Sequence, residues 1–221
     1  MVERQSPRSS QTAVYVGAGP NRSDVIDLLL DYNYTTVPSI HMAEMLMLIG
    51  YEDINPNFYS EKAIQGTVFS DAKDKDDVSL YNQGVLRKLP MVGINRGALF
   101  LNVMNGGSCW QNIDEHRRHT HLIEDLLTGE RFEASSLHHQ SMIPSDKGIV
   151  TAVAYKSNTR KCEDYSLQDD EYPDIEAVVY PDTKTVCYQP NPELANINFK
   201  LEDCAKYLFK LIEEVCFKCV D

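Results

Sequence analysis

The sequence has no long apolar run and no excess of basic charge. None of its apolar stretches reaches the roughly 18 residues that can span a membrane, and the polar residues 1–11 lack the apolar core of a secretory signal. We therefore expect a soluble, cytoplasmic protein with a disordered lead-in over residues 1–11 and no membrane partner. The net charge of −12 disfavours nucleic acid as a partner, because phosphate backbones are bound by basic surfaces.

Cysteines are few and irregularly spaced, which argues against a disulfide framework in a chain of 221 residues. Cys216 and Cys219 form a C-x-x-C pair, but a structural zinc site needs two further ligands and no second pair is present. From these counts we expect no bound metal and no cofactor.

Alternating strand-like and helix-like segments predict a three-layer α/β fold with some antiparallel extension of the sheet. We expect one domain over residues 12–221, without internal repeats or low-complexity segments. A charge-rich stretch, residues 71–77, is expected to form a solvated loop and the first turn of a helix. The expected strands are 12–16, 34–37, 91–94, 131–134, 148–155, 175–180 and 185–189, the expected helices are 23–30, 76–86, 97–104 and 201–220, and residues 43–49 fit either.

The apolar strand at 91–94 runs into Gly93-Ile-Asn95-Arg-Gly97 and then into an apolar helix. This pattern is typical of a nucleophile elbow, in which flanking glycines allow a sharp turn that lifts the central side chain above the sheet. An elbow normally carries Ser or Cys, which can attack a carbonyl carbon. A primary amide is a very poor nucleophile, so Asn95 predicts an elbow without its usual chemistry.

Four segments in this order resemble motifs of the class I glutamine amidotransferases, most closely the branch that includes the γ-glutamyl hydrolases. The elbow and its helix resemble that family's Gly-Ile-Cys-Arg-Gly-Ala-Gln motif, and the second segment resembles the loop that helps to build its oxyanion hole. The segments are GINRGALFLNVMNGG (93–107), GYEDINPNFY (50–59), SLHHQ (136–140), and EAVV with QPNPE (176–179 and 189–193). Order and spacing agree over roughly residues 12–215, and the resemblance implies a flavodoxin-like sheet, mostly parallel, with helices on both faces.

The resemblance also implies a Cys-His-Glu triad, in which the thiolate attacks, the imidazole moves the proton and the carboxylate orients the imidazole. The matching residues here are Asn95, Asn191 and Glu193. Nucleophile and base are both missing, and triad residues act as a unit. Two further departures are Tyr51, which replaces a glycine of the oxyanion loop, and Leu99, which replaces a glutamine after the elbow.

Asparagine tolerates positive φ better than most residues, so Asn95 could keep the turn without the chemistry. It could also hydrogen-bond Asn191, or bind a ligand through its amide. We expect the surrounding ligand-binding residues to be those that the resemblance places around the elbow and its mouth: Gly50, Tyr51, Arg96, Gly97, Leu99, His138 and His139.

A cysteine and a group of histidines lie outside these motifs. Cys109 is expected to be a packed small hydrophobe rather than a nucleophile. His116, His119 and His121 have a spacing that could suit metal ligands, but the resembling family has histidines in this region without a catalytic metal, so no metal is expected.

Three functions follow from these features. The first is a catalytically inactive pseudoenzyme that binds a small ligand, such as a glutamine-like or γ-glutamyl compound, or a protein partner. The second is an amidotransferase or γ-glutamyl/amide hydrolase in which Glu193, His138 or His139 activates water without a cysteine. The third is a partner-dependent subunit, because glutaminase domains of the resembling family often pair with an ammonia-consuming synthetase.

Overall fold

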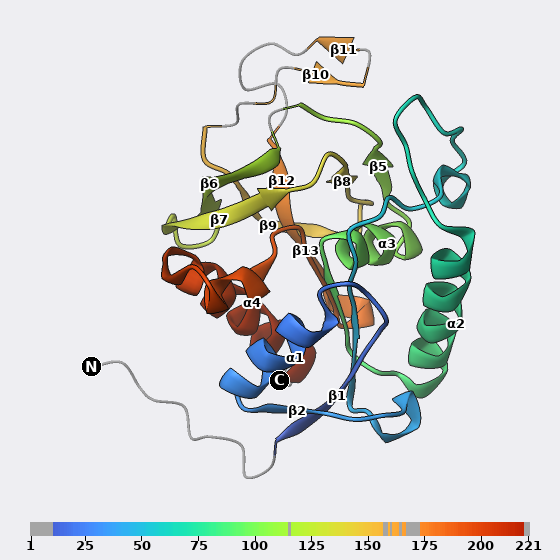
Figure 1. Cartoon of the computed structure of the whole chain (residues 1–221), viewed down its shortest axis with the longest axis vertical. Coiled ribbons are helices and arrows are strands. Elements are labelled where there is room, and N and C mark those ends of the chain that lie inside the picture. Colours follow the sequence, from blue (N-terminus) through green and yellow to red (C-terminus); the bar gives the residue numbers. More distant parts are fainter. Residues whose placement is uncertain are drawn as a thin grey trace.

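A computed structural model of the chain describes residues 11–114, 116–156, 159, 161–163, 165–166 and 173–218. Nine of its strands form one sheet in the order β2-β1-β3-β4-β13-β12-β9-β6-β7 (Figure 1). Five strands at one end are parallel: β2 (Tyr34–Thr36), β1 (Thr12–Val16), β3 (Met45–Leu48), β4 (Met91–Ile94) and β13 (Thr185–Tyr188). The remaining four are antiparallel: β12 (Ile175–Tyr180), β9 (Ile149–Ala154), β6 (Arg117–Asp125) and β7 (Arg131–Leu137).

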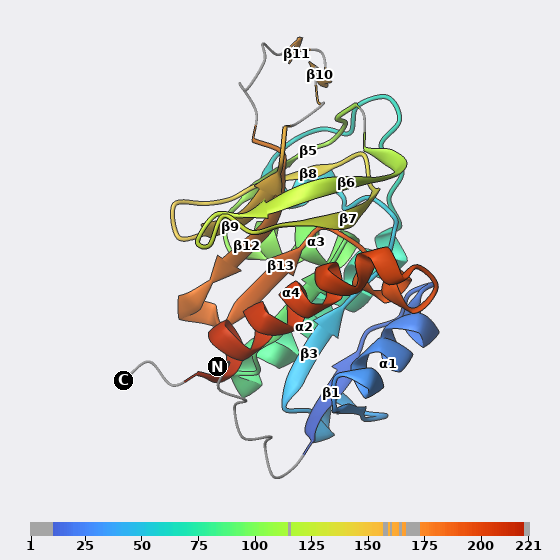
Figure 2. The ribbon, with the colours of Figure 1, turned by 90° about the vertical axis from the view of Figure 1, so that its left-hand side faces the viewer.

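Helices cover both faces of this sheet, and each face has its own apolar core. On one face, α1 (Arg22–Asp31) and α4 (Glu202–Ile212) bury Leu29 and Leu208 against the strands. On the other face, α3 (Arg96–Met104) buries Leu101, and α2 (Asp71–Arg87) packs Val78 beside it. Figure 2 shows α4 in front of the sheet and α2 behind it. The mostly parallel, three-layer α/β fold predicted from the sequence is confirmed.

Short elements complete the described chain. Two small antiparallel pairs lie outside the main sheet, β5 (Ser108–Trp110) with β8 (Ser141–Ile143) and β10 (Lys161–Cys162) with β11 (Tyr165–Ser166). The 3-10 helices are η1 (Ile40–Met42), η2 (Pro56–Tyr59), η3 (Pro181–Thr183), η4 (Pro192–Asn196) and η5 (Phe199–Leu201), and a π-helix, η6 (Glu213–Phe217), follows α4.

Three predicted details are wrong. Helix α1 begins at Arg22 and ends at Asp31, so it extends one residue beyond the expected range 23–30 at each end. The closing helix ends at Ile212 and continues as the π-turn η6 rather than as one helix to residue 220. Residues 71–77 are helical throughout, since Ser70 caps α2 by accepting a hydrogen bond from the Lys73 amide, and two of their four aspartates are buried instead of solvated.

None of the helices in the described part of the chain is long and apolar enough to cross a membrane. The five cysteines within that part, Cys109, Cys162, Cys187, Cys204 and Cys216, are free and buried. The predicted lead-in falls almost wholly outside the described residues, as does Cys219 of the C-x-x-C pair.

Candidate functional site

The elbow is built at the end of β4, where Asn95 has φ 51° and ψ −113°. Close backbone approach explains both flanking glycines: a Cβ on Gly93 would lie 2.2 Å from the Gly97 oxygen, and a Cβ on Gly97 would lie 2.0 Å from the Leu48 oxygen. Such distances allow no side chain, so the turn requires glycine on both sides of residue 95. The predicted elbow, with a positive φ at Asn95, is confirmed.

The three residues at the expected triad positions form one hydrogen-bonded chain. The amide nitrogen Nδ2 of Asn95 donates to Asn191 Oδ1 at 2.8 Å, and Asn191 Nδ2 donates to Glu193 Oε1 at 2.9 Å. Asn95 Nδ2 also lies 3.3 Å from the Leu137 carbonyl oxygen at the end of β7. Asn95, Asn191 and Glu193 are all at most 2% exposed. The amides thus replace a nucleophile–base pair by a buried relay with fixed direction.

Glu193 Oε1 collects two further donors from other parts of the chain. Asn21 Nδ2 donates to it at 2.6 Å and the Tyr51 hydroxyl at 3.3 Å. Burial, together with the Glu193 carboxylate, raises the pKa of Tyr51, so this phenol stays protonated and donates. The residue that replaces a glycine of the resembling loop thus contacts the carboxylate at the third triad position.

Asn21 is a site residue that the sequence reading missed. It follows the turn after β1, and its side chain meets Glu193, which follows β13. The only available signal was topological, because parallel strands bring their carboxyl ends to the same edge of a sheet.

The loop at 50–59 lies against the elbow through backbone contacts. Gly50, with φ +146°, accepts a hydrogen bond from the Arg96 amide at 3.4 Å. The Tyr51 amide is engaged by its neighbour, Glu52 Oε2, at 3.3 Å. The Arg96 amide follows the elbow residue and the Tyr51 amide lies in the 50–59 loop, and both already have acceptors within the chain.

Two residues expected to bind ligand are instead structural. The guanidinium of Arg96 is fully buried and forms ion pairs with Asp74 and Asp77 of α2. Leu99 is 2% exposed and belongs to the apolar core beneath α3. The charged group of Arg96 therefore lies between the two carboxylates of α2 and not at the elbow. A buried cation is stable only with such counter-charges.

His138 and His139 turn to different partners. His139 Nε2 pairs with Asp53 Oδ1 of the 50–59 loop at 2.8 Å and is partly exposed. His138 is buried, and its Nδ1 donates to the Gln140 carbonyl at 2.9 Å. The described contacts join neither imidazole to Asn95, Asn191 or Glu193.

His138 instead joins a histidine cluster with His116, His121 and Glu176. His121 Nε2 lies 3.1 Å from Glu176 Oε1, and His116 Nδ1 and His138 Nε2 each lie 3.9 Å from the same oxygen. Burial opposes the ionised form of Glu176, but the three imidazoles outweigh it and lower its pKa to about 2. Burial lowers the pKa of His138 to about 4, which leaves that ring neutral near pH 7.

Comparison with known proteins places the chain in a family. Residues 30–157 match the sequence profile of the Peptidase C26 family. The chain belongs to this family. Two relatives are a glutamine amidotransferase-like protein of Rickettsia prowazekii, 27% identical over 132 residues (58% of this chain, 44% of the relative), and a Schizosaccharomyces pombe protein of glutamine amidotransferase type, 27% identical over 145 residues (56% of each). The chain therefore spans about half the length of these curated relatives.

Solved structures agree on the fold of this peptidase C26 chain. A glutamine amidotransferase from Thermotoga maritima superposes with a TM-score of 0.56 at 13% identity, covering 93% of this chain and 90% of that one. The predicted class I glutamine amidotransferase-like family and fold are thus confirmed.

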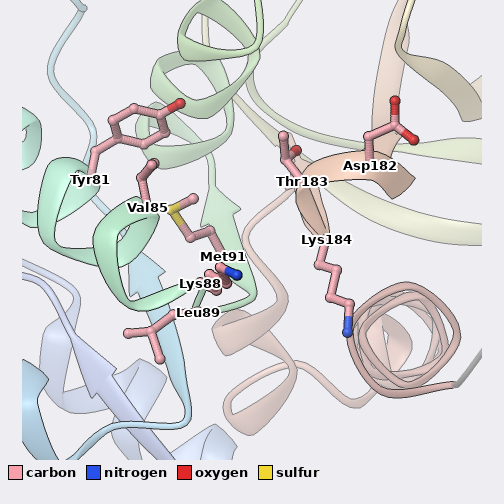
Figure 3. Close-up of a pocket in the computed structure, with 8 residues that line it drawn as sticks. All are labelled: Tyr81, Val85, Lys88, Leu89, Met91, Asp182, Thr183 and Lys184. Atoms are coloured by element: carbon pink, nitrogen blue, oxygen red, sulfur yellow. The ribbon is translucent and has the colours of Figure 1, made fainter.

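Neither of the remaining candidate features of the peptidase C26 chain reaches the elbow. Cys109 is 1% exposed within the core, where burial raises its pKa, as expected of a packed small hydrophobe. Figure 3 shows a pocket lined by Tyr81, Val85 and Met91 on one side and by Asp182, Thr183 and Lys184 on the other. Met91 begins β4 and Lys184 precedes β13, so this pocket lies at the amino ends of these strands. Asn95 follows the carboxyl end of β4, on the opposite side.

Proposed function

We propose that this peptidase C26 chain is a catalytically silent glutamine amidotransferase homologue that uses its retained scaffold for binding. The observation that carries the proposal is the buried relay from Asn95 through Asn191 to Glu193. A carboxamide cannot form the thioester that γ-glutamyl transfer requires, and a second carboxamide cannot take up the proton.

Two contacts around the relay support the same conclusion. The amides of Arg96 and Tyr51, which border the expected oxyanion position, already have acceptors within the chain. The Tyr51 hydroxyl donates a hydrogen bond to Glu193, the one residue of the expected triad that is retained. Electrostatic stabilisation of an oxyanion needs free donors aimed at it, so the loss extends beyond the two substitutions.

For binding, we favour a protein partner over a small ligand at the elbow. The side chains of the relay are almost inaccessible to solvent, whereas Ile197 and Phe199, which follow Glu193 by a few residues, are 85% and 82% exposed. A glutamine-like or γ-glutamyl compound remains the small-molecule class to test, since the homologues suggest that chemistry.

The decisive experiment is ammonia release from glutamine and from a γ-glutamyl amide by the purified full chain. We expect no turnover above buffer and no covalent adduct with a glutamine-analogue electrophile. Turnover by the wild type that disappears in Glu193→Gln would overturn the proposal and favour a water-based mechanism.

A set of re-armed variants identifies which barrier matters. We expect N95C/N191H to remain much slower than N95C/N191H/Y51G, because Tyr51 competes for Glu193 in the former. N95C alone is the matched control, with a thiol and no base. Equal rates in the double and triple variants would contradict the role assigned to Tyr51.

A further inference from the structure

We propose that His116, His121, His138 and Glu176 form a binding site for one divalent transition-metal ion with zinc-type coordination. The site is separate from the elbow, and the inference holds whether or not the elbow is catalytically silent. The proposal also departs from our expectation, based on cysteine and histidine spacing, that no metal is bound.

The geometry points to one ion because a single carboxylate oxygen faces three imidazole nitrogens. Glu176 Oε1 lies 3.1 Å from His121 Nε2 and 3.9 Å from both His116 Nδ1 and His138 Nε2. Ligand atoms of His116, His121 and Glu176 all lie within 4.8 Å of one another. Tetrahedral zinc, with bonds of about 2.0–2.2 Å, places its ligand atoms about 3.3 Å apart, so small shifts would bring these three side chains into coordination. His138 lies outside this group of three, and its Nε2, 3.9 Å from Glu176 Oε1, would move in as the fourth ligand.

The outer nitrogens of two imidazoles are held in the way that metal-binding histidines require. His116 Nε2 lies 3.1 Å from Asp174 Oδ2 and 3.1 Å from Thr159 Oγ1, and His138 Nδ1 donates to the Gln140 carbonyl. A carbonyl only accepts, so Nδ1 carries a proton, and Nε2, the atom that faces Glu176, is the nitrogen available to an ion. Such outer contacts fix the tautomer and the ring orientation of metal ligands.

The facing atoms lack hydrogen-bond partners among the described residues. Glu176 Oε1 and Oε2, His121 Nε2 and His138 Nε2 are buried and unsatisfied, the contact at 3.1 Å being poorly aligned for a hydrogen bond. Glu176 is fully buried. Glu176 thus has imidazoles within ion-pair distance but no well-aligned hydrogen-bond donor, and an ion is one of the few groups that could satisfy all four atoms together.

One competing contact exists on the ligand side. His116 Nδ1 lies 3.0 Å from the Ser136 hydroxyl, which a bound ion would replace as the partner of that lone pair. His121, whose side chain is 18% exposed, provides the route to solvent.

The donor set identifies the class of ion. Three imidazoles and one carboxylate suit Zn²⁺, Co²⁺ or Ni²⁺, whereas Ca²⁺ and Mg²⁺ prefer oxygen ligands alone. Four protein ligands also leave no open position, which is typical of structural zinc. The ion would tie β6, which carries His121, to β12, which carries Glu176. His116 directly precedes β6 and His138 directly follows β7, so these two strand ends would be held as well.

The test is metal binding by the full chain, stripped with a chelator and titrated near neutral pH with Zn²⁺ against a competing chromogenic chelator. We expect one Zn²⁺ per chain, a higher thermal midpoint with the ion, and visible absorption of a four-coordinate complex with Co²⁺. H121A and H138A should each weaken binding at least tenfold, and Asp174→Asn about 10–100-fold through loss of its contact to His116.

Two controls separate this site from other binding. His41, an exposed residue of η1, provides the matched variant H41A, which should bind as the wild type does. C216S/C219S tests the C-x-x-C pair and should also leave binding unchanged. Far-UV circular dichroism of each stripped variant establishes that it is folded.

The proposal is overturned if the stripped wild-type chain binds no stoichiometric Zn²⁺ or Co²⁺. It is equally overturned if binding survives in both H121A and H138A, or is lost only in C216S/C219S. The wild-type stoichiometry decides the matter even if a histidine variant does not fold.

Discussion

Arg96 matches the family's elbow motif, but its side chain stabilises the fold. It follows the elbow residue directly, yet its guanidinium points into the interface between α3 and α2, where Asp74 and Asp77 receive it. Sequence motifs place such a residue at the site, but they do not give the direction of its side chain.

Removing this cation should be strongly destabilising. We expect Arg96→Met to lower the free energy of unfolding by about 3–5 kcal/mol, because the buried Asp74 loses its counter-charge and Asp77 keeps only Lys73. Urea unfolding measures the difference. Arg131→Met is the matched control, since that side chain is 46% exposed in its pair with Glu124, and it should unfold close to the wild type. Equal losses in both variants would contradict the structural role of Arg96.

Predictability at this scale was uneven. The elbow followed from glycine spacing, which is a local rule. The Asn95–Asn191 contact, between residues 96 apart, was one alternative suggested by the resemblance to the family's triad. The burial of Asp74 and Asp77 could not be predicted in this way, because runs of charged residues are usually solvated. These two are buried because the Arg96 side chain packs against them. Asn21 was invisible for a similar reason, since its partner lies 172 residues away.

Among the elements, β7 connects the two sites of the protein. Ser135 accepts a hydrogen bond from the Asn191 amide at 2.7 Å, whereas Ser136 contacts His116 at 3.0 Å. Successive residues of a strand point to opposite faces, so one strand supports the relay on one side and the histidine cluster on the other.

The end of β6 is joined to α4 by Asp125 and Lys210, whose Oδ2 and Nζ atoms lie 2.8 Å apart. Burial opposes ionisation of Asp125, but hydrogen bonds from Lys210, the Leu127 amide and the Thr128 hydroxyl outweigh it and lower the pKa. A carboxyl whose folded pKa is depressed stabilises the fold above its unfolded pKa of about 3.9. That contribution disappears as the pH falls through the folded value.

We therefore expect Asp125→Asn to be less stable than the wild type near neutral pH, with the difference shrinking as the pH falls below about 4. Urea midpoints at a series of pH values measure this. Asp31→Asn, at the exposed end of α1, should retain the wild-type pH dependence. A difference between wild type and Asp125→Asn that stays constant down to the acid limit would rule out this linkage.

For the molecule as a whole, the sheet separates two apolar cores. Leu208 and Ile212 of α4 belong to one, and Leu101 of α3 belongs to the other. Residues without shared partners contribute independently to stability, whereas packed neighbours do not.

Leu101→Ala should cost about 2–5 kcal/mol and Ile212→Val about 0.5–1.5 kcal/mol. The double variant should lose the sum of the two within about 0.5 kcal/mol. Leu208→Ala combined with Ile212→Val is the contrasting pair, one turn apart on the same helix, and should depart further from additivity. Chemical unfolding gives all these values, and strong coupling across the sheet would argue against two separate cores.

At this scale the sequence was most informative. Strands 12–16, 91–94 and 175–180 were predicted with the bounds observed, since β-rich apolar runs between turn residues are distinctive. Strand β6, with its histidines and arginines, was missed because polar strands at a sheet end lack that pattern. The closing helix was predicted too long, as amphipathic spacing continues through η6 although its hydrogen bonding does not.

The one-way order of donors from Asn95 to Glu193 has an evolutionary consequence. Under the proposed function, a return to thiol chemistry requires changes at both 95 and 191, and the Tyr51 contact to Glu193 remains a further barrier. A single reversion at 95 supplies sulfur without a proton acceptor, and one at 191 supplies an acceptor beside an inert amide. Under that proposal, neither single change restores the pairing of a thiol with an imidazole.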